Sequence, residues 1–310
     1  MQVYESIQEI NVKRPTVVTV GTFDGIHLGH KYTFDCLINI AEQNDLESVI
    51  VTFSDHPKEI IQNRDVQILT VKDEKIELLR SIMIDHLLII PFTRELASMN
   101  YKTFTKSVLI DQLKMKNLLF GYDHAFGKNR EGSYQNLKDF GKQNEFTVDR
   151  VESVQLGNVT VSSTQIRQLL TDGQLNKANR FLGRPYLLIG EVVRGEQRGQ
   201  SLGFPTANLK PLHPHKLIAN SGVYLVKVEF ERKVYHGMMN IGVNPTFSGT
   251  DLKLEVHIFD YNRTIYGEQL NIFFLKKLRN EQKFESISDL KDQLNSDLQL
   301  SKDLLRRQSF

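Results

Sequence analysis

The chain has 310 residues, 40% hydrophobic and 25% charged, which is enough for two domains that each bury a core. Lys and Arg total 39 against 37 for Asp and Glu, so the basic excess typical of nucleic-acid-binding or membrane-surface proteins is absent. A single cysteine, no leader-like start and no apolar run near the ~20 residues that span a bilayer exclude internal disulfides and predict a cytoplasmic protein.

Short apolar runs alternate with helical patterns between Pro15 and Arg150. The apolar runs predict strands at Thr16–Val20, Ser48–Phe53, His86–Pro91, Asn117–Gly121 and Phe146–Val151. The segments between them predict helices near Lys31–Gln43, Asp73–Met83, Arg94–Gln112 and Tyr134–Gln143. This alternation predicts an α/β domain with a doubly wound parallel sheet, which binds ligands beyond the carboxyl ends of its strands.

The stretch Gly21–His30, GTFDGIHLGH, follows the first predicted strand and leads into the first helix. A Gly-bearing turn before a helix N-terminus offers N–H groups and the helix dipole to an anion, so it predicts a phosphate site. His27 and His30 can share one side of the turn, where they suit oxygens that gain charge in a transition state, and Gly29 lets a ligand approach the backbone. A zinc pair or two surface histidines are the alternatives. Zinc needs a third ligand, and Cys36 has no clustered partner.

Three later segments of this half hold further candidates. His56-Pro57 follows the second strand and Phe120–Gly132 follows the fourth; a turn and a solvated Gly-rich loop are their ordinary interpretations. Val161–Arg167, VSSTQIR, precedes a helical pattern and is first of all a helix cap. Its hydroxyls and N–H groups also suit a phosphate, to which Arg167 adds a forked cation.

The pattern changes after Gly183-Arg184-Pro185, which ends a short helix at Gln174–Phe181. We therefore place the domain boundary there, giving domains 1–183 and 184–310. The second half predicts short strands at Leu187–Val193, Gly222–Phe230, Val234–Ile241, Lys253–Phe259 and Leu270–Leu278. Such strands, separated by Gly, Asn and Pro, predict a small antiparallel barrel or sandwich. Ser288–Arg307 carries leucines on one face and predicts a helix packed on it.

Two segments of the second half carry candidate chemistry. Gly203–Asn208, GFPTAN, follows a loose Gly-rich loop, which alone is weak evidence for phosphate binding. On the strand around Glu255, alternation puts Glu255 and His257 on one side. A glutamate there is ordinarily solvated, but phosphoryl transfer needs a carboxylate that accepts the proton of an alcohol.

The first-half motifs carry a family resemblance. Gly21–His30 resembles the His-x-Gly-His signature of nucleotidyltransferases, in particular the flavin adenylyltransferase half of bifunctional riboflavin kinase/FAD synthetases. Val161–Arg167 closely resembles their second signature, Ser-Ser-Thr-x-Ile-Arg, and follows in the family's order. Ser54 and Asp55 depart from the family's Asp and Pro, and His124 stands where the family carries an aromatic residue. The resemblance implies His27 and His30 as catalytic residues, contacts to ATP phosphates from Gly21, Phe23, Gly29, Ser163, Thr164 and Arg167, and flavin contacts from Asp123 and Phe126.

The second half carries the other part of the resemblance. Gly203–Asn208 resembles the Gly-x-Pro-Thr-Ala-Asn signature of riboflavin kinases, and Leu254–Asp260 resembles the strand that carries their base. The resemblance implies Glu255 as the catalytic base, Gly203 and Thr206 at the ATP phosphates, Thr206 and Asn208 as Mg²⁺ ligands, and Arg279 at the flavin. Magnesium prefers oxygen ligands and retains waters, so two neutral oxygens beside the phosphates suffice.

The resemblance covers nearly the whole chain and implies two activities. The C-terminal domain phosphorylates riboflavin to FMN, and the N-terminal domain adenylylates FMN to FAD and releases pyrophosphate. The implied partners are riboflavin, FMN and ATP with Mg²⁺ as cofactor, for a monomer or weak homo-oligomer that binds neither nucleic acid nor membrane. One alternative is a riboflavin kinase whose N-terminal domain is inactive or altered in substrate; FMN accumulating without FAD indicates it. The other is a flavin-binding regulatory protein, indicated by flavin binding without ATP consumption.

Overall fold

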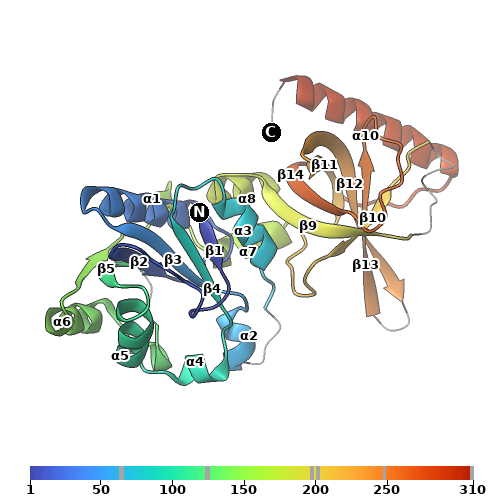
Figure 1. Ribbon diagram of the computed structural model, residues 1–310. Helices are drawn as coiled ribbons and strands as arrows, with labels where there is room; N and C mark the ends of the chain where they lie inside the picture. Colours follow the sequence, from blue (N-terminus) through green and yellow to red (C-terminus); the bar gives the residue numbers. More distant parts are fainter. Residues whose placement is uncertain (63–65, 123–125, 196–198, 200–202, 247–248, 308–310) are drawn as a thin grey trace. The chain divides into compact units, whose positions relative to one another are not determined.

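The computed structural model describes residues 1–62, 66–122, 126–195, 199, 203–246 and 249–307. The chain divides into two compact units, Met1–Ser163 and Thr164–Phe310, each with its own hydrophobic core (Figure 1). The boundary that we expect after Gly183 stays a prediction. Gly183 does end a helix locally: it adopts a left-handed φ of 68°, and its N–H bonds back to the last turn.

The sheet of the first unit has six parallel strands in the order β1–β4–β3–β2–β5–β6. Their bounds are β1 (Gln2–Tyr4), β2 (Thr16–Val20), β3 (Glu47–Phe53), β4 (His86–Ile90), β5 (Met115–Phe120) and β6 (Thr147–Arg150). The strands β2, β3 and β4 are buried along their whole length, as strands covered on both faces must be. Because β2 pairs with both β3 and β5, the winding reverses at β2, and such a reversal creates a ligand crevice at the carboxyl ends.

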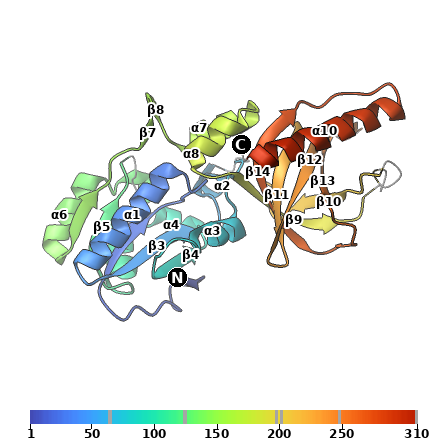
Figure 2. The same ribbon diagram turned by 90° about the horizontal axis from the view of Figure 1, so that it is seen from above.

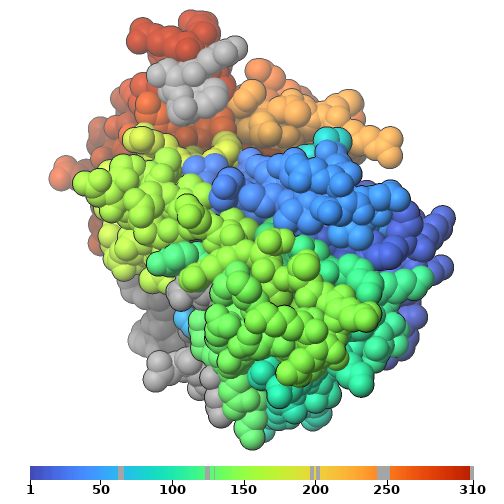
Figure 3. Space-filling model, turned by 90° about the vertical axis from the view of Figure 1, so that its left-hand side faces the viewer, coloured from blue at the N-terminus to red at the C-terminus, as the bar shows by residue number. Residues whose placement is uncertain are grey.

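Helices cover both faces of this sheet, which confirms the doubly wound prediction. One face packs on α1 (Leu28–Gln43) and α3 (Lys72–Leu79), and the other packs on α5 (Tyr101–Phe104), η1 (Thr105–Ile110) and α6 (Tyr134–Asn144). Successive side chains of a strand point to opposite faces of the sheet. Val17 and Ile50 therefore belong to the same core cluster as Phe34 of α1, whereas Val18 belongs to the cluster on the other face with Leu137 of α6. In the space-filling view of Figure 3, α1 (blue) and α6 (green) lie on the surface of this unit.

The single helix expected over Arg94–Gln112 is wrong. The segment forms α4 (Arg94–Ser98), α5 and the π-helix η1, because Met99 is extended and the Asn100 side chain caps a new helix by accepting from Thr103 N at 2.8 Å. Shorter elements also escape prediction: α2 (Pro57–Gln62), η2 (Lys128–Arg130) and the hairpin β7 (Gln155–Leu156) and β8 (Val159–Thr160).

The second unit contains a closed antiparallel barrel in the order β10–β13–β12–β11–β14–β9, which confirms the barrel prediction. Its strands are β9 (Tyr186–Val193), β10 (Ala207–Pro211), β11 (Gly222–Phe230), β12 (Lys233–Thr246), β13 (Gly249–Ile258) and β14 (Gln269–Arg279). The pairing of β9 with β10 closes the barrel, so each of its six described strands has a partner on both sides.

The described residues of the second unit also form the helices α7 (Ser163–Thr171, its first residue in the first unit), α8 (Leu175–Leu182) and α10 (Ile287–Arg307). Asn179 fixes α8 to the barrel, since its amide donates to Phe274 O and its oxygen accepts from Tyr186 N. The helix α10 lies along the outside of the barrel in both views (Figures 1 and 2), where Leu294 and Leu298 pack against Phe204 and Leu275. The C-terminal helix is therefore confirmed.

Candidate active sites

The loop Gly21–His30 leaves the carboxyl end of β2 and enters α1. Gly21 N donates to Val51 O at 3.0 Å, and the ring of Phe23 covers Gly21 so closely that a Cβ there would lie 2.8 Å from Phe23 Cζ. Phe23 and Ile26 both adopt left-handed backbone, with φ of 47° and 40°. Such conformations are costly for non-glycine residues and persist only where the surroundings enforce them.

The two histidines of the loop lie together at the start of α1. His27 is the N-cap, and its Nδ1 accepts from His30 N at 3.4 Å. The two imidazoles stack with centroids 3.6 Å apart, and Phe23 meets His30 edge-on at 5.3 Å. A Cβ on Gly29 would lie 3.1 Å from His27 Cε1, so glycine leaves room for this stack. Both imidazoles therefore sit where the first-turn N–H groups attract an anion.

The acidic residue of the loop supports its shape. The buried Asp24 carboxylate accepts from Leu69 N at 3.2 Å and from Thr70 N at 2.9 Å, and Gly25 N donates to Thr70 Oγ1 at 2.9 Å. The Ser163 hydroxyl donates to Asp24 O at 2.7 Å. The structure thus brings the start of the second motif onto the first, although they lie far apart in the sequence.

The rest of the second motif continues into α7. Thr164 is exposed in the first turn of that helix, and Arg167 is half-buried. One helical turn separates Ser163 from Arg167, so the two share a face of α7. The chain divides between Ser163 and Thr164 into its two units, and the part that Thr164 and Arg167 take in phosphate binding stays a prediction.

A cavity of about 530 Å³ opens beside this loop in the first unit. Val20 and Thr22 line it from the end of β2, Phe53 from the end of β3, and Phe126 from the segment after β5. Its wall is mostly apolar, and Lys58, Lys128 and Arg130 supply positive charge at the same cavity. A pocket of this size and character suits a flat apolar ligand that carries an anionic group.

Ser54 and Asp55, which depart from the family's residues, are not among the residues that line this pocket. Ser54 Oγ donates to Asp55 Oδ2 at 2.6 Å, and the described lining includes His56 and Pro57 but neither of these two residues. His56 Nδ1 accepts from Lys58 N at 3.2 Å, which caps the short α2. Asp123 and His124, which the sequence analysis also singles out, lie outside the described residues.

In the barrel, three polar residues form a row of cross-strand pairs on adjacent strands. Asn208 on β10 stands opposite Glu255 on β13, and Glu255 stands opposite Asn240 on β12. Directly opposed residues of an antiparallel pair project to the same face. Glu255 and His257 are half-buried, whereas Leu254, Val256 and Ile258 are buried, so the predicted alternation holds along β13.

His257 holds the GFPTAN segment against this row. Its Nδ1 lies 2.8 Å from Pro205 O, and because a carbonyl oxygen only accepts, Nδ1 carries the proton. The ring of His257 also meets Phe204 edge-on, with centroids 5.2 Å apart. This brings Thr206 beside β13. Gly203, the first residue of the segment, has a left-handed φ of 83° and lies on the surface.

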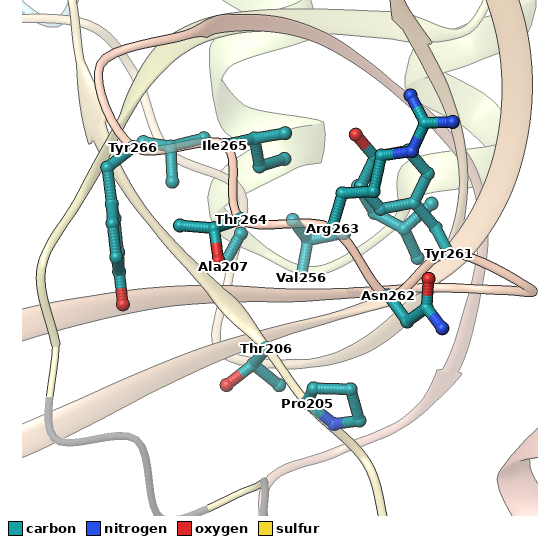
Figure 4. A pocket seen from close by; sticks show the side chains of 12 residues that line it. Pro205, Thr206, Ala207, Val256, Tyr261, Asn262, Arg263, Thr264, Ile265 and Tyr266 are labelled. Carbon is teal, nitrogen blue, oxygen red and sulfur yellow. The ribbon is translucent and has the colours of Figure 1, made fainter.

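Two cavities adjoin Thr206. One, of about 340 Å³, lies between Pro205–Ala207 and the loop Tyr261–Tyr266, and Figure 4 shows Pro205 and Thr206 across from Thr264 of that loop. The other, of about 360 Å³, is lined by Thr206, Glu255 and Arg279 together with apolar side chains, among them Phe204, Val223, Met238, Phe284, Leu290 and Leu294. Thr206 is a wall of both, so a group held in one cavity can face a group held in the other.

Arg279 binds the C-terminal helix as well as lining the second cavity. Its Nε lies 3.1 and 2.9 Å from the two oxygens of Asp297 on α10, and the Asp297 side chain is 4% exposed. Gln293 Nε2 also donates to Asp297 at 2.9 Å. The pair thus holds α10, with Leu290 and Leu294, over the cavity.

Replacing Asp297 with asparagine is expected to destabilise the barrel unit by about 3 kcal/mol, because it leaves a largely buried guanidinium without its charge partner. Chemical denaturation of the full chain, followed by a probe in the second unit, measures this change. Asp303→Asn on the same helix is the matched control: Asp303 forms an exposed pair with Arg306 at 3.4 Å, and its loss costs little. Equal effects of the two substitutions would contradict the role of the buried pair.

Sequence reasoning missed four residues of these sites. Asn240 and His257 follow from strand alternation once the partner strands are known, but the pairing itself is non-local. Asp24 is part of the recognised motif, yet its partners lie far along the chain. Lys75 carries no motif at all, although its side chain is only 4% exposed and sits behind the loop.

Comparisons with known proteins match each half of the chain to a family. A family model described as FAD synthetase matches residues 9–165, and one described as riboflavin kinase matches residues 182–305. A protein of Buchnera aphidicola (subsp. Schizaphis graminum) named bifunctional riboflavin kinase/FMN adenylyltransferase is 36% identical over 292 residues, 93% of each chain. One of Haemophilus influenzae with the same name is 34% identical over 306 residues, 97% of this chain and 98% of that one.

A solved structure is also similar over the whole length. A crystal structure from Streptococcus pneumoniae described as a macrolide-efflux protein matches with a TM-score of 0.87 at 32% identity, covering 97% of this chain and 98% of that one. In the part of this chain that the structure describes, no helix is both long and apolar enough to cross a membrane.

Proposed function

The chain belongs to the bifunctional riboflavin kinase/FMN adenylyltransferase family, and from that premise we propose how its residues divide the two reactions. The enzyme phosphorylates riboflavin to FMN and adenylylates FMN to FAD, each time with ATP. The observation that carries the division is that each unit has its own pocket: Glu255 and Asn240 line one in the barrel, and the loop that carries the histidine pair contributes Thr22 to one in the parallel-sheet unit.

In the barrel, Glu255 acts as the base for phosphorylation. The attacking hydroxyl must lie beside the carboxylate, so riboflavin occupies the apolar cavity that Glu255 lines, and ATP occupies the cavity beneath Tyr261–Tyr266. The carboxylate of Glu255 accepts the proton as the ribityl oxygen attacks the γ-phosphorus, and ADP leaves. Thr206 borders both cavities and orients the transferring group.

Thr206 and Asn208 suit a Mg²⁺ ion, because both offer the neutral oxygens that this ion accepts beside phosphates. The lack of a Cβ on Gly195 supports this, since a Cβ would occupy the space of the Asn208 carboxamide. Among the described residues, no group of three or more His, Cys, Asp or Glu side chains could hold a metal ion. Bound Mg²⁺ neutralises phosphate charge during transfer.

Replacing Gly195 with alanine is expected to raise the KM for Mg²⁺–ATP in the kinase reaction by about tenfold or more, because the new Cβ displaces Asn208. A tenfold change corresponds to ~1.4 kcal/mol, the value of one good hydrogen bond or ligand contact. Initial rates of FMN formation at varied Mg²⁺–ATP measure it. Adenylylation of supplied FMN by the same preparation is the control and is expected to keep its rate. An unchanged KM would contradict the assignment of Asn208.

In the parallel-sheet unit, adenylyl transfer needs no base, because the FMN phosphate is itself the nucleophile. Its oxygen attacks the α-phosphorus of ATP and pyrophosphate leaves. His27 and His30 donate hydrogen bonds to the phosphate oxygens that gain charge, and the N–H groups of Phe23 and Gly29 hold the triphosphate. Gly21 and Ser163 shape this phosphate site, because the Gly21 N–H donates to Val51 O and the Ser163 hydroxyl donates to Asp24 O. Thr164 and Arg167 add to the phosphate contacts.

The flavin of FMN occupies the apolar cavity beside this loop, against Phe126, and the cations Lys58, Lys128 and Arg130 attract its phosphate. A time course of riboflavin, ATP and Mg²⁺ with the purified chain tests the division of labour. We expect FMN to rise first and FAD to follow. FMN alone would indicate a silent first unit. Asp123 is proposed as a further flavin contact.

The proposal extends to two further properties, the cell compartment and the assembly. We propose a cytoplasmic enzyme, supported by the single cysteine and by the use of ATP, and a monomer or weak homo-oligomer. Size-exclusion chromatography with light scattering measures the second property.

A further inference from the structure

Lys75 of α3 is a buried lysine behind the adenylyl-transfer loop. Its side chain is only 4% exposed, and its ammonium donates to Thr22 O at 2.9 Å, to Thr52 Oγ1 at 3.0 Å and to Phe53 O at 3.0 Å. A lysine ammonium has three protons, and here each meets a protein oxygen. The group is therefore fully occupied by the protein and does not reach a substrate.

The three acceptors come from two segments that line the flavin cavity. Thr22 belongs to the loop after β2, whereas Thr52 and Phe53 end β3. Both Thr22 and Phe53 are part of the cavity wall. The ammonium consequently fixes the end of one strand to the loop that leaves the next, at the edge of the sheet where both substrates bind.

The loop requires restraint at this point. Phe23 and Ile26 adopt left-handed backbone that is unfavourable for their side chains. Thr70 and Leu69, a few residues before Lys75, supply the bonds that hold Asp24 and Gly25. Lys75 adds the bond to Thr22 O, where the loop begins. The segment 69–75 therefore supports the loop from Thr22 to Gly25.

Peptide geometry links this bond to the phosphate site. The peptide between Thr22 and Phe23 is planar and trans, so the Phe23 N–H points opposite to the Thr22 carbonyl. Because Lys75 holds that carbonyl, it also sets the direction of the Phe23 N–H, which the proposed function places at the ATP phosphates. We infer that Lys75 is a positioning residue for adenylyl transfer, acting through the Thr22–Phe23 peptide; this rests on the proposed function.

Burial makes the protonation of Lys75 sensitive to pH in a range where enzyme activity can be measured. Desolvation lowers the pKa of Lys75 to about 8, although the Asp24 carboxylate opposes the shift. Asp24 faces it from the loop, Glu74 is its neighbour on α3, where it accepts from Val71 N, and β3 presents only Thr52 and the carbonyl of Phe53. A neutral amine has two protons, so above pH about 8 Lys75 can no longer donate to all three oxygens at once.

The pH dependence of stability distinguishes the loss of a Lys75 hydrogen bond from unfolding of the chain. The pKa of Lys75 is lower in the folded chain than in the unfolded chain, so between pH 8 and 10.5 the unfolded state binds more protons. The contribution of Lys75 to stability therefore rises with pH over this window. Adenylyl transfer is expected to fall in the same window, because the neutral amine holds the Thr22–Phe23 peptide less firmly. The substrate phosphates are already fully ionised there, so their titration does not contribute to the fall.

The experiment compares Lys75→Met, Lys75→Arg and Lys72→Met in the full-length chain. Lys72 lies on the same helix but is only half-buried and pairs with the exposed Glu5 at 2.7 Å, so it is the matched control. For each protein, kcat and KM of FMN adenylylation are measured between pH 7 and 10, with riboflavin phosphorylation as the internal reference. Circular dichroism and thermal unfolding verify that each variant folds.

We expect Lys75→Met to lower kcat of adenylylation about 10²-fold, as a misplacement near the reacting groups does, with phosphorylation unchanged. Lys75→Arg, which stays charged, is expected to retain more activity and to lose the alkaline decline that the wild type shows near pH 8. Lys72→Met is expected to match the wild type.

Wild-type kcat of adenylylation in folded Lys75→Met would overturn the inference, and so would an alkaline decline that persists in Lys75→Arg. If neither variant folds, the wild-type profile decides: adenylylation without a decline near pH 8 relative to phosphorylation overturns it. A wild-type chain that forms no FAD at any pH contradicts the proposed function instead, so the two failures are distinguishable.

Discussion

Replacement of Glu255 by glutamine is expected to slow riboflavin phosphorylation by about 10²- to 10⁴-fold, the usual contribution of a positioned general base. Glutamine keeps the shape of the side chain and its place opposite Asn208 and Asn240, but it cannot accept the proton of the ribityl hydroxyl. Single-turnover formation of FMN from riboflavin measures the loss, and binding of riboflavin is expected to change little.

The control for this substitution is Glu229→Gln. Glu229 is also a half-buried glutamate on a barrel strand, but it pairs with Lys227 at 2.6 Å and lines neither described cavity. Its loss is expected to leave phosphorylation unchanged. Because the adenylyl-transfer site lies in the other unit, Glu255→Gln supplied with FMN is expected to make FAD at the wild-type rate. Retention of phosphorylation in Glu255→Gln would show that the base lies elsewhere.

Replacement of His30 by alanine is expected to lower adenylyl transfer by about 10²- to 10³-fold, because one donor to the charged transition state is lost. The imidazole stacks on His27 at 3.6 Å and meets Phe23, so its removal also loosens the neighbours that hold it. Formation of pyrophosphate and FAD from supplied FMN measures the effect.

The kinase reaction of the same His30→Ala preparation serves as its reference. Riboflavin is expected to be converted to FMN at the wild-type rate, so FMN accumulates and FAD does not. His236→Ala, on β12, removes a histidine that lines neither described barrel cavity and is expected to leave both reactions intact. Undiminished FAD formation by folded His30→Ala would contradict the role of the pair.

The sequence predicts the regular elements best where burial dictates them. Thr16–Val20 and Gly222–Phe230 coincide with β2 and β11, because a strand inside a core must be a continuous or alternating apolar run. It fails where local signals conflict with distant pairing. Ala207–Pro211 contains polar residues and a proline and looks like a loop, yet it forms β10 because β9 and β13 pair with it on both sides.

Among the site residues too, those in short local motifs are predictable and those that depend on distant packing are not. The sequence points to His27 and His30 through their spacing in one turn, and to Asn208 through the resemblance of a short motif. It does not point to Lys75, because what distinguishes this residue is burial beside two other segments, and a lysine inside an amphipathic helix pattern is ordinarily solvated. The pairing of Arg279 with Asp297 also depends on where α10 docks, which no local pattern contains.

Mixing the two single-site variants tests the central claim, that one chain carries two independent active sites. Glu255→Gln and His30→Ala are each incubated with riboflavin, ATP and Mg²⁺, alone and together, and the flavins are separated by chromatography. We predict that His30→Ala alone stops at FMN, that Glu255→Gln alone leaves riboflavin unchanged, and that the mixture makes FAD. A mixture that makes no FAD, from variants that each retain their other reaction, would contradict the account.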